Sequence, residues 1–386
     1  MTDATAPTAP STTAAGDQAP QIALVLGGGN ALGSYLAGAW EGLEAGGVRP
    51  DWVLGSSIGA VTGAILAGNA PEHRLERLRA FWDEAKLHTR QALFRHGKLR
   101  QIYNGVHSAA TLVLCRPNIF RDRYPGLWSI LPWMPNDVAL YDLSPLRRSL
   151  ERLVDFDRLN RAEMRYTAVA IDVETGEEAY FDNTRQRIGP EHVLASASIV
   201  PAFPPMEIDG RAYCDPGYTT NLPLDLPFHE QGDRDVVCIA AELFSLRAPR
   251  PRSLDAALER THDFIFASAG RRTIEALGRE YALREQLRPD GPRATLLHLT
   301  YQAAGDELAA KTFDYSPSSI EDRWTAGRRD MEAGLALLER ASTGEEAGRA
   351  RFRHLVVDPS RAAAHAEAGA AGTGAEGGAA ALRQVA

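Results

Sequence analysis

Residues 22–33, IALVLGGGNALG, and residues 52–59, WVLGSSIG, decide the fold of this chain. Each stretch begins with a short apolar run of strand length, passes directly into a glycine-containing loop, and leads into an apolar helical pattern. The first helical pattern ends at Gly46 and Gly47, and the second extends to about Gly68. Two successive strand–loop–helix units predict an α/β fold, in which helices cover a mostly parallel sheet.

The run GSSIG at residues 55–59 has the form G-x-S-x-G and places Ser57 between a strand and a helix of small residues. A nucleophile elbow requires this context, because the serine occupies a tight, strained turn and flanking glycines avoid backbone clashes. The N-terminus of the following helix favours developing negative charge. The pattern also occurs by chance as a Gly/Ser turn that merely starts a helix. The context here favours Ser57 as a nucleophile.

The glycine loop at residues 27–33 follows the other strand of this pair. Because the carboxyl ends of parallel strands lie side by side, free N–H groups of this loop could form an oxyanion hole near Ser57. The alternative is a phosphate-binding loop. The spacing fits G-x-G-x-x-G poorly, and the Lys-Ser/Thr pair of a P-loop is absent, so the oxyanion interpretation is preferred.

A serine nucleophile needs a base, and the residues alone leave two candidates. None of the ten histidines lies in an evident catalytic context; His229, in the run PFHE, is the most plausible and would give a histidine-assisted triad. Asp215, in the run YCDPG, ends an apparent strand and enters a turn. Taken alone, Asp-Pro-Gly is more often an ordinary turn.

Three segments together resemble the patatin-like phospholipase family. They are LGGGNALGSYLAG at 26–38, GSSIGAVTGAILA at 55–67 and ASASIVPAFPPMEIDGRAYCDPGYTTNLPLD at 195–225. They are similar to the glycine-rich oxyanion loop, the elbow with its helix, and the aspartate segment of that family. Their order and spacing also fit, since Asp215 follows Ser57 by 158 residues. The resemblance extends over roughly residues 22–230.

The resemblance implies a three-layer α/β/α fold and a Ser–Asp dyad that works without histidine, metal or organic cofactor. Carried over by position, Ser57 is the nucleophile and Asp215 the base, and the oxyanion donors come from Gly27, Gly28, Gly29 and Asn30. The implied activity is hydrolysis of lipid or phospholipid carboxylic esters through an acyl-enzyme intermediate. The substrate partner would be a lipid or other acyl ester.

The sequence departs from the family pattern at three positions. Leu32 stands where the oxyanion loop usually carries Lys or Arg, Asn30 replaces its third glycine, and Pro216 follows the aspartate in place of Gly. Backbone N–H donation survives the Asn substitution, but the missing cation matters if it stabilises the loop or binds a phosphate headgroup. The alternatives are therefore a general esterase, thioesterase or polyester depolymerase on the same dyad, or a catalytically weakened lipid-binding protein.

The two ends of the chain differ in composition from its middle. Residues 1–20 are mainly Ala, Thr, Pro and small polar residues, and 12 of the 26 residues at 361–386 are Ala. Neither end has enough large apolar side chains to offset the entropy of ordering. We expect disordered tails at 1–20 and 359–386, a patatin-like catalytic domain at 21–230, and a mixed α/β C-terminal extension at 231–358 packed on it.

The charge and cysteine counts narrow the partners and the compartment. The 386 residues include 42 basic and 50 acidic side chains, a net charge of −8, which disfavours nucleic acid as a partner. Cys115, Cys214 and Cys238 form neither a disulfide framework nor a CxxC pair, so a reducing compartment is expected. There is no signal-peptide pattern and no apolar run of membrane-spanning length. We expect a cytoplasmic protein, with peripheral contact at the inner membrane surface if its substrate is lipid.

The remaining segments carry structural expectations. Asp-Gly at 209–210 between the extended runs 206–208 and 211–214 predicts a β-hairpin. The aromatic residues of 112–134 have two interpretations, a lid or acyl-chain wall that meets a lipid surface, or side chains packed over the core. The amphipathic patterns at 253–288 and 318–340 predict helices that serve as scaffold or as the surface of a homo-oligomer. Ser318 and Glu321 have the spacing of a capping box.

Overall fold

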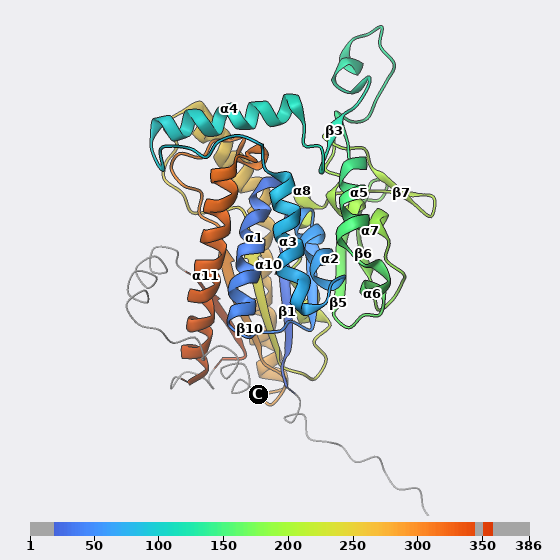
Figure 1. The fold of residues 1–386 in the computed structure, drawn as a ribbon. Coiled ribbons are helices and arrows are strands. Elements are labelled where there is room, and N and C mark those ends of the chain that lie inside the picture. The colour runs from blue at the N-terminus through green and yellow to red at the C-terminus, as the bar shows by residue number, and fades with distance from the viewer. Residues whose placement is uncertain (1–18, 344–349, 358–386) are drawn as a thin grey trace, which may run out of the picture.

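The computed structural model describes residues 19–343 and 350–357. The predicted tails at 1–20 and 359–386 therefore lie almost entirely outside the described residues. Figure 1 shows helices on both sides of a central sheet. The α/β fold with a mostly parallel central sheet, predicted from the two strand–loop–helix units, is confirmed.

The main sheet has nine strands among the described residues, and six of them form a parallel core. Its order is β11-β10-β9-β1-β2-β5-β8-β7, and β6 also pairs with β5. The pairings from β11 to β5 are all parallel, whereas β6, β7 and β8 pair antiparallel. The strands are β1 (Gln21–Leu26), β2 (Trp52–Ser56), β5 (Arg165–Asp172), β6 (Glu178–Asp182), β7 (Met206–Ile208), β8 (Arg211–Cys214), β9 (Val236–Glu242), β10 (Ala294–Thr300) and β11 (Phe352–Val356).

The helices fall into long elements that cover the sheet and short ones that shape its loops. The α-helices are α1 (Ser34–Ala45), α2 (Ile58–Ala67), α3 (Pro71–Ala85), α4 (Lys98–Leu114), α5 (Ser144–Leu153), α6 (Phe156–Asn160), α7 (Pro190–Ala197), α8 (Gly217–Thr220), α9 (Asp225–His229), α10 (Leu254–Leu287) and α11 (Pro317–Thr343). The 3-10 helices are η1 (Asn30–Gly33), η2 (Gly126–Ile130) and η3 (Lys311–Phe313). In the described part of the chain, no helix is both long and apolar enough to cross a bilayer.

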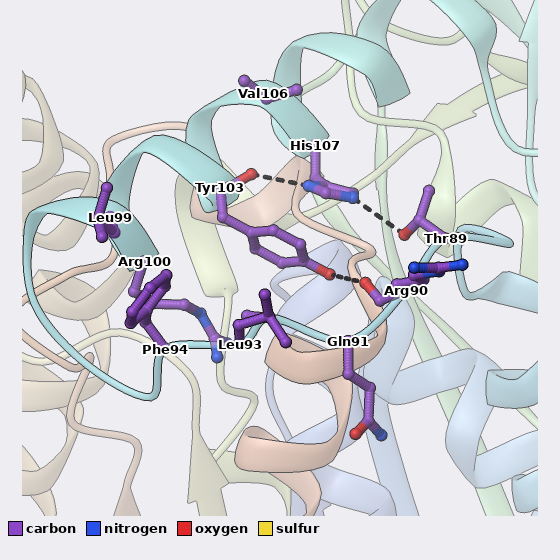
Figure 2. A pocket seen from close by; sticks show the side chains of 11 residues that line it. Thr89, Arg90, Gln91, Leu93, Phe94, Leu99, Arg100, Tyr103, Val106 and His107 are labelled. Carbon is purple, nitrogen blue, oxygen red and sulfur yellow. Dashed lines mark hydrogen bonds between the residues drawn. The ribbon is translucent and has the colours of Figure 1, made fainter.

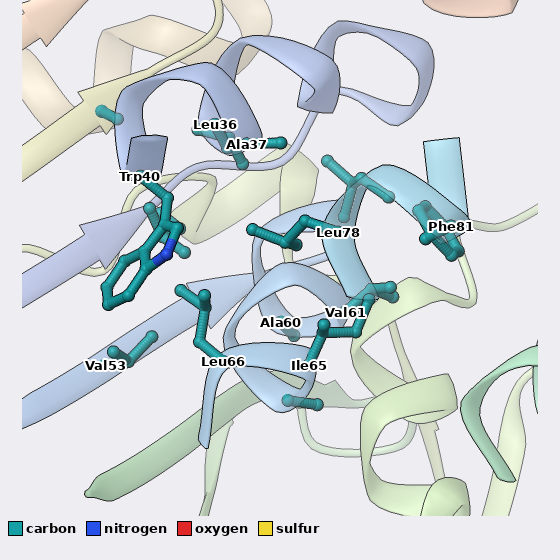
Figure 3. Close-up of a cluster of buried hydrophobic side chains, with 14 of the residues drawn as sticks. Leu36, Ala37, Trp40, Val53, Ala60, Val61, Ile65, Leu66, Leu78 and Phe81 are labelled. Carbon is teal, nitrogen blue, oxygen red and sulfur yellow. The ribbon is translucent and has the colours of Figure 1, made fainter. Parts of the chain in front are cut away.

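The sheet separates two hydrophobic cores, as a three-layer arrangement requires. Along β1, Leu24 and Leu26 point into the larger core, and Ala23 and Val25 point into the smaller one. The larger core includes side chains of α1, α2 and α3 packed on β2 (Figure 3). The smaller core lies under α9 and α10. Alternate residues of one buried strand thus bind both helical layers to the sheet.

Most predicted elements are present with nearly the expected limits. The hairpin at 206–214 is confirmed, and its turn residues Asp209 and Gly210 have φ values of 50° and 77°. These positive angles are those of the turn that Asp-Gly favours. The predicted capping box is wrong: the Ser318 hydroxyl accepts from Ala92 N–H, and Ser316 caps α11 by accepting from Ser319 N–H.

The range predicted as a C-terminal extension contributes three strands to the main sheet. Strand β9 lies between β1 and β10, so residues on both sides of position 230 form one continuous sheet. The division at 230 falls between α9 and β9 and stays a prediction about domains.

A small two-stranded sheet holds the base of a projecting segment. It pairs β3 (Arg121–Asp122) with β4 (Tyr141–Asp142). In Figure 1 the chain between these strands, which includes η2, extends beyond the rest of the molecule, and α4 lies across the same end.

Candidate active site

Ser57 lies at the junction of β2 and α2, where the backbone adopts a strained conformation. Its φ of 56° and ψ of −124° are rare for a residue with a side chain and cost on the order of 1–3 kcal/mol. Gly59 makes the tight turn feasible, because a Cβ atom at this position would lie 2.1 Å from the carbonyl oxygen of Leu26. The strand–turn–helix geometry of a nucleophile elbow is therefore present, with Ser57 half-buried at the N-terminus of α2.

Hydrogen bonds from two other helices hold the strained turn in place. Ser57 N–H donates to the hydroxyl of buried Ser196 on α7, at 3.0 Å. The neighbouring Ser56 hydroxyl donates to the carbonyl of Thr220 on α8, at 3.1 Å. These contacts fix the orientation of the elbow independently of its own backbone preference.

Asp215 follows β8 and is buried, with only 4% of its surface exposed. Its N–H donates to the Ser198 carbonyl at 3.1 Å, and its Oδ1 accepts from Gly217 N–H at 2.7 Å. The Ser57 side chain is close enough to lower the carboxyl pKa, although Oδ2 has no hydrogen bond of standard geometry with the described residues. Burial outweighs both interactions and raises the pKa of Asp215 from 3.8 to about 7. The fold thus brings a serine and a carboxyl that titrates near neutral pH together.

Pro216 is compatible with this arrangement. It precedes α8 with a φ of −81°, close to the value that the proline ring imposes. Proline offers no N–H, but the contact to the Asp215 carboxylate comes from Gly217 instead. The departure from the family pattern leaves the aspartate hydrogen-bonded.

The glycine loop after β1 lies directly against Ser57. A Cβ atom at Gly28 would lie 3.0 Å from the Ser57 Cβ, so only glycine leaves this space open. The N–H of Gly27 donates to Ala241 O at 3.0 Å, and the N–H of Gly28 donates to Asn221 O at 3.2 Å.

Two of the four expected oxyanion donors are therefore already engaged. The N–H groups of Gly29 and Asn30 form no hydrogen bond with the part of the chain that the structure describes. The candidates for stabilising an oxyanion beside Ser57 narrow to these two. The sequence alone could not reveal the engagement of Gly27 and Gly28, because both partners lie about 200 residues away.

Asn30 occupies a backbone position that normally suits glycine. Its φ is 52°, in the left-handed region that Asn tolerates better than most residues with a side chain. Its Oδ1 accepts a hydrogen bond from the Tyr315 hydroxyl. Asn therefore replaces the third glycine of the loop without changing the handedness of the backbone there.

A cation reaches this loop from another element. Leu32, at the position where the family carries Lys or Arg, is an apolar side chain fully buried in the core. Arg323 of α11 is also fully buried, and its guanidinium extends to the backbone of the loop. Its Nη1 donates to Ala31 O at 3.3 Å and to Asp314 O at 2.9 Å, and its guanidinium pairs with Glu307 at 2.8 Å. Arg323 thus stabilises the loop from a position 292 residues away in the chain.

The comparison with family models agrees with this geometry. The model described as patatin-like phospholipase matches residues 24–228, more than half of the chain. This chain belongs to the patatin-like phospholipase family. A second model, described as patatin phospholipase, matches residues 277–346. The resemblance drawn from the three sequence segments is confirmed, and with it membership of a family of lipid acyl hydrolases.

Curated relatives match over the same region. Patatin-like phospholipase domain-containing protein 6 of Homo sapiens is 25% identical over 221 residues, which are 56% of this chain and 13% of that protein. An NTE family protein of Mycobacterium tuberculosis is 25% identical over 211 residues, 54% of this chain and 46% of that one. The chain therefore spans less than half the length of these relatives. Among solved structures, the match to VipD from Legionella pneumophila covers 93% of this chain and 77% of the VipD chain, with 15% sequence identity and a TM-score of 0.35.

In this patatin-like protein, an aromatic wall stands beside the candidate base. Phe266 of α10 lies against Gly217 and stacks on Tyr218 and on Phe244, with ring centroids 5.5 Å and 4.7 Å apart. These side chains exclude water on one side of Asp215, in keeping with the burial that raises its pKa.

His229, the alternative base, does not join this site. It is half exposed at the end of α9, where its ring nitrogens lie 3.9 Å from the Asp225 carboxylate and 3.6 Å from that of Glu280. The structure brings Ser57, Asp215 and the glycine loop together and places His229 in a different group of contacts.

Sequence reasoning missed four residues that position the patatin-like site. Ser196 and Asn221 lie within segments that carried the family resemblance, so those motifs did contain a signal for them. Tyr315 and Arg323 lie in the C-terminal third of the chain and contact the loop only through tertiary folding. No local pattern marks them.

Proposed function

We propose that this protein is a serine acyl hydrolase that cleaves lipid or phospholipid carboxylic esters through a Ser57–Asp215 dyad. The observation that carries the proposal is the juxtaposition of a strained serine at an elbow with a buried carboxyl whose pKa is about 7. A base that titrates near neutral pH combines sufficient proton affinity with a substantial ionised fraction. Membership of a lipid acyl hydrolase family supports the substrate class.

The first half-reaction follows from the positions of these groups. The ionised Asp215 carboxylate accepts the Ser57 hydroxyl proton while Oγ bonds to the ester carbonyl carbon. The carbonyl oxygen becomes an oxyanion, which the free N–H groups of Gly29 and Asn30 stabilise; in comparable sites one such donor contributes about 2.7–4 kcal/mol. The intermediate then collapses, the bond to the alcohol oxygen breaks, and Asp215 returns its proton to the leaving alcohol.

Hydrolysis of the acyl-enzyme repeats the same proton transfers with water. Asp215 takes a proton from the water molecule, whose oxygen attacks the acyl carbonyl, and the proton then returns to the Ser57 oxygen as the acid leaves. Each half-reaction restores the charge of the dyad, so the cycle consumes only ester and water.

The contacts at the site favour a hydrolase over a weakened, purely lipid-binding protein. That alternative was suggested by Leu32 and Pro216, and these departures are accommodated by Arg323 at the loop and by Gly217 N–H at Asp215. Esterase, thioesterase and polyester depolymerase activities use the same dyad and remain distinguishable by substrate.

A fluorophosphonate probe tests the nucleophile. We expect the wild-type protein to be labelled, Ser57→Ala to lose all labelling, and Asp215→Asn to be labelled at least a hundredfold more slowly. Ser342→Ala on α11 is the control, since this hydroxyl donates only within its own helix, to the Leu338 carbonyl, and the variant should retain labelling. Persistent labelling of Ser57→Ala would contradict the assignment.

The substrate class is tested with p-nitrophenyl esters of increasing acyl length, acyl thioesters and phospholipid vesicles. We expect turnover to rise with chain length and to include phospholipid. Activity that peaks at the shortest chains and is absent on phospholipid would replace the lipid hydrolase by a general esterase.

A further inference from the structure

Helix α4 buries polar side chains and exposes apolar ones, the reverse of the usual arrangement. Its buried side chains are polar, namely Arg100, Asn104, His107, Ser108 and Thr111. Its large exposed side chains are apolar, namely Leu99, Ile102, Val106, Leu112, Val113 and Leu114. A surface helix of a water-soluble domain normally buries its apolar stripe, so the exposed stripe of α4 requires an apolar contact that the described residues do not supply.

Hydrogen bonds of Arg100 and Asn104 attach the first half of α4 to the body. Arg100 donates to Asn104 Oδ1 at 2.8 Å and pairs with Asp322 at 2.9 Å, and Asn104 donates to the Asp306 carbonyl at 3.1 Å. These bonds fix which face points inward. The outward apolar face is therefore specified by the fold and is not the result of a loosely placed helix.

A second apolar group lies on the projecting segment between β3 and β4. Its exposed side chains are Tyr124, Leu127, Trp128, Ile130, Trp133 and Val138. Trp128 and Trp133 are 60% and 76% exposed, which answers the question that the sequence left open for residues 112–134: most of these side chains do not pack over the core, although Phe120 does.

A hollow lies between α4 and the chain segment that precedes it. Residues 89–94 run beside the first half of the helix and enclose with it a space of about 600 Å³, whose lining side chains Figure 2 shows. Leu93 and Phe94 at this hollow are both exposed, Leu93 almost completely. We call the outward side chains of α4, residues 93–94 and residues 124–133 the docking surface.

The docking surface borders the end of the molecule that holds the candidate active site. Helix α4 packs against η3, and η3 packs against η1, which begins at Asn30 of the glycine loop. At the base of the projecting segment, the N–H groups of Leu140 and Tyr141 donate to the carbonyls of Pro201 and Ala202. These residues closely follow Ser198, whose carbonyl accepts from the N–H of Asp215. Figure 1 shows α4 and the projecting segment at this same end.

Charge distinguishes this part of the chain from the remainder. Residues 86–135 contain eight Lys or Arg and one acidic residue, Asp122, in a protein whose net charge is −8. Arg90, Arg95 and Lys98 are exposed and form no ion pair with the part of the chain that the structure describes. A cationic rim therefore accompanies the apolar side chains.

We infer that the docking surface binds the surface of an anionic lipid bilayer. Exposed apolar side chains mixed with unpaired cations are the features by which interfacial proteins enter the headgroup region, where Trp and Tyr are favoured. A two-fold dimer through the same surface would bring one cationic rim against the other, with Asp122 the single acidic residue of 86–135 to offset the repulsion, which disfavours a second copy. The inference deepens the proposed function, because it names the residues that would bring the site to a lipid ester.

Vesicle binding by the full-length Ser57→Ala protein tests this without turnover. We expect co-sedimentation with vesicles of phosphatidylcholine and phosphatidylglycerol, and at least tenfold weaker binding to phosphatidylcholine alone. Neutralising Arg90, Arg95 and Lys98 together by substitution with Gln should weaken binding on the order of 100-fold, about fivefold for each cation. Trp128→Ser with Trp133→Ser should weaken it at least tenfold.

The matched control is Leu283→Ser with Leu287→Ser. These side chains are exposed and apolar like the tryptophans, but they lie near Arg288, which pairs with Asp233 at the opposite end of the sheet, just before β9. Their substitution should not change vesicle binding. Tryptophan emission provides a direct readout, because Trp128 and Trp133 are exposed while Trp40, Trp52, Trp82 and Trp324 are buried; emission should shift to the blue and be quenched by brominated lipid.

Several results would overturn the inference. These are absence of vesicle binding by the Ser57→Ala protein, binding that both sets of variants leave unchanged, or a dimer that the tryptophan substitutions abolish in the absence of any vesicle binding. Turnover of a soluble short-chain ester separates the two proposals. The protein that keeps Ser57 and carries Trp128→Ser with Trp133→Ser should retain that turnover. If the wild-type protein binds vesicles normally but does not turn over the soluble ester, only the proposed function is contradicted.

Discussion

At Asp215 the requirements of folding and of proton transfer oppose each other. Burial raises the pKa of this carboxyl from 3.8 to about 7, so the folded protein holds the proton more tightly than the unfolded chain does. A raised carboxyl pKa lowers folding stability as pH increases from about 4 to about 7, by about 4 kcal/mol in total. Above pH 7 the folded protein carries a buried, ionised carboxylate, the form in which the proposed base accepts a proton.

This opposition predicts a pH-dependent effect of Asp215→Asn. The neutral amide avoids the cost of ionisation and can still accept from Gly217 N–H. We expect the variant to melt at a higher temperature than the wild type near pH 8, with the difference shrinking toward pH 4, while its ester hydrolysis is lost. In the wild type, kcat/KM should rise about tenfold per pH unit below pH 7 and then level off.

Thermal unfolding across this pH range provides the measurement. Asp209→Asn, at the exposed hairpin turn, is the control and should give a much smaller pH-dependent difference. A gain in melting temperature for Asp215→Asn that is the same at pH 4 and pH 8 would show that Asp215 is not the group that titrates.

At the scale of elements, the packing of α1 on α11 positions the glycine loop. The two helices approach so closely that a Cβ at Gly327 would lie 2.0 Å from the Tyr35 carbonyl oxygen, and one at Gly38 would lie 1.9 Å from the Trp324 carbonyl oxygen. Helix α11 carries Arg323, whose guanidinium reaches Ala31. A change in the separation of these helices therefore acts directly on the candidate oxyanion hole.

Gly327→Ala should destabilise the protein by about 3 kcal/mol or more, because the added methyl group meets backbone that cannot move away cheaply. Gly278→Ala on α10 is the matched control. Nothing lies within 4 Å of a Cβ there, so the substitution should stabilise the helix by about 0.5–1 kcal/mol. Urea unfolding compares the two, and equal effects would contradict this account of the α1–α11 contact.

The elements also show what periodicity can and cannot predict. Strand β1, the hairpin and the long helices α10 and α11 agree with their patterns because burial and turn chemistry are local. Periodicity does not specify which face of α4 points inward. Hydrogen bonds from Arg100 to residues more than 200 positions away decide that. The capping residue at the start of α11 was also predicted wrongly. Ser316 and Ser318 both lie where a cap is possible, and the Ser318 hydroxyl is engaged by a tertiary hydrogen bond from Ala92 N–H.

At the scale of the whole molecule, the order of the strands brings distant segments of the chain together. Strand β1 is the centre of the sheet and pairs with β2 on one side and with β9 on the other. The motifs that revealed Ser57 and Asp215 all lie before position 230, so the dyad could be proposed from the sequence. The supports of the loop lie after it, at Tyr315 and Arg323, and depend on strand pairing that no local pattern specifies.

This topology predicts that residues 1–230 do not fold alone. Removal of the later residues deletes β9, β10 and β11, leaves one edge of β1 unpaired, and uncovers the core beneath α10 and α11. We expect the fragment to lack a cooperative thermal transition and near-ultraviolet circular dichroism. A chain that ends at Val357 retains every described strand and is the control. A cooperative, fluorophosphonate-reactive fragment 1–230 would instead support a separate catalytic domain.

The central position of β1 also sets a sequence of events during synthesis. Ser57 leaves the ribosome long before β9, the second partner strand of β1. Tyr315 and Arg323, which hold the glycine loop beside Ser57, emerge later still. A nascent chain therefore carries Ser57 without the contacts that hold the glycine loop until Tyr315 and Arg323 have been synthesised. The candidate site is assembled only after Arg323 has emerged, so under the proposed function a shorter nascent chain is inactive toward lipid esters.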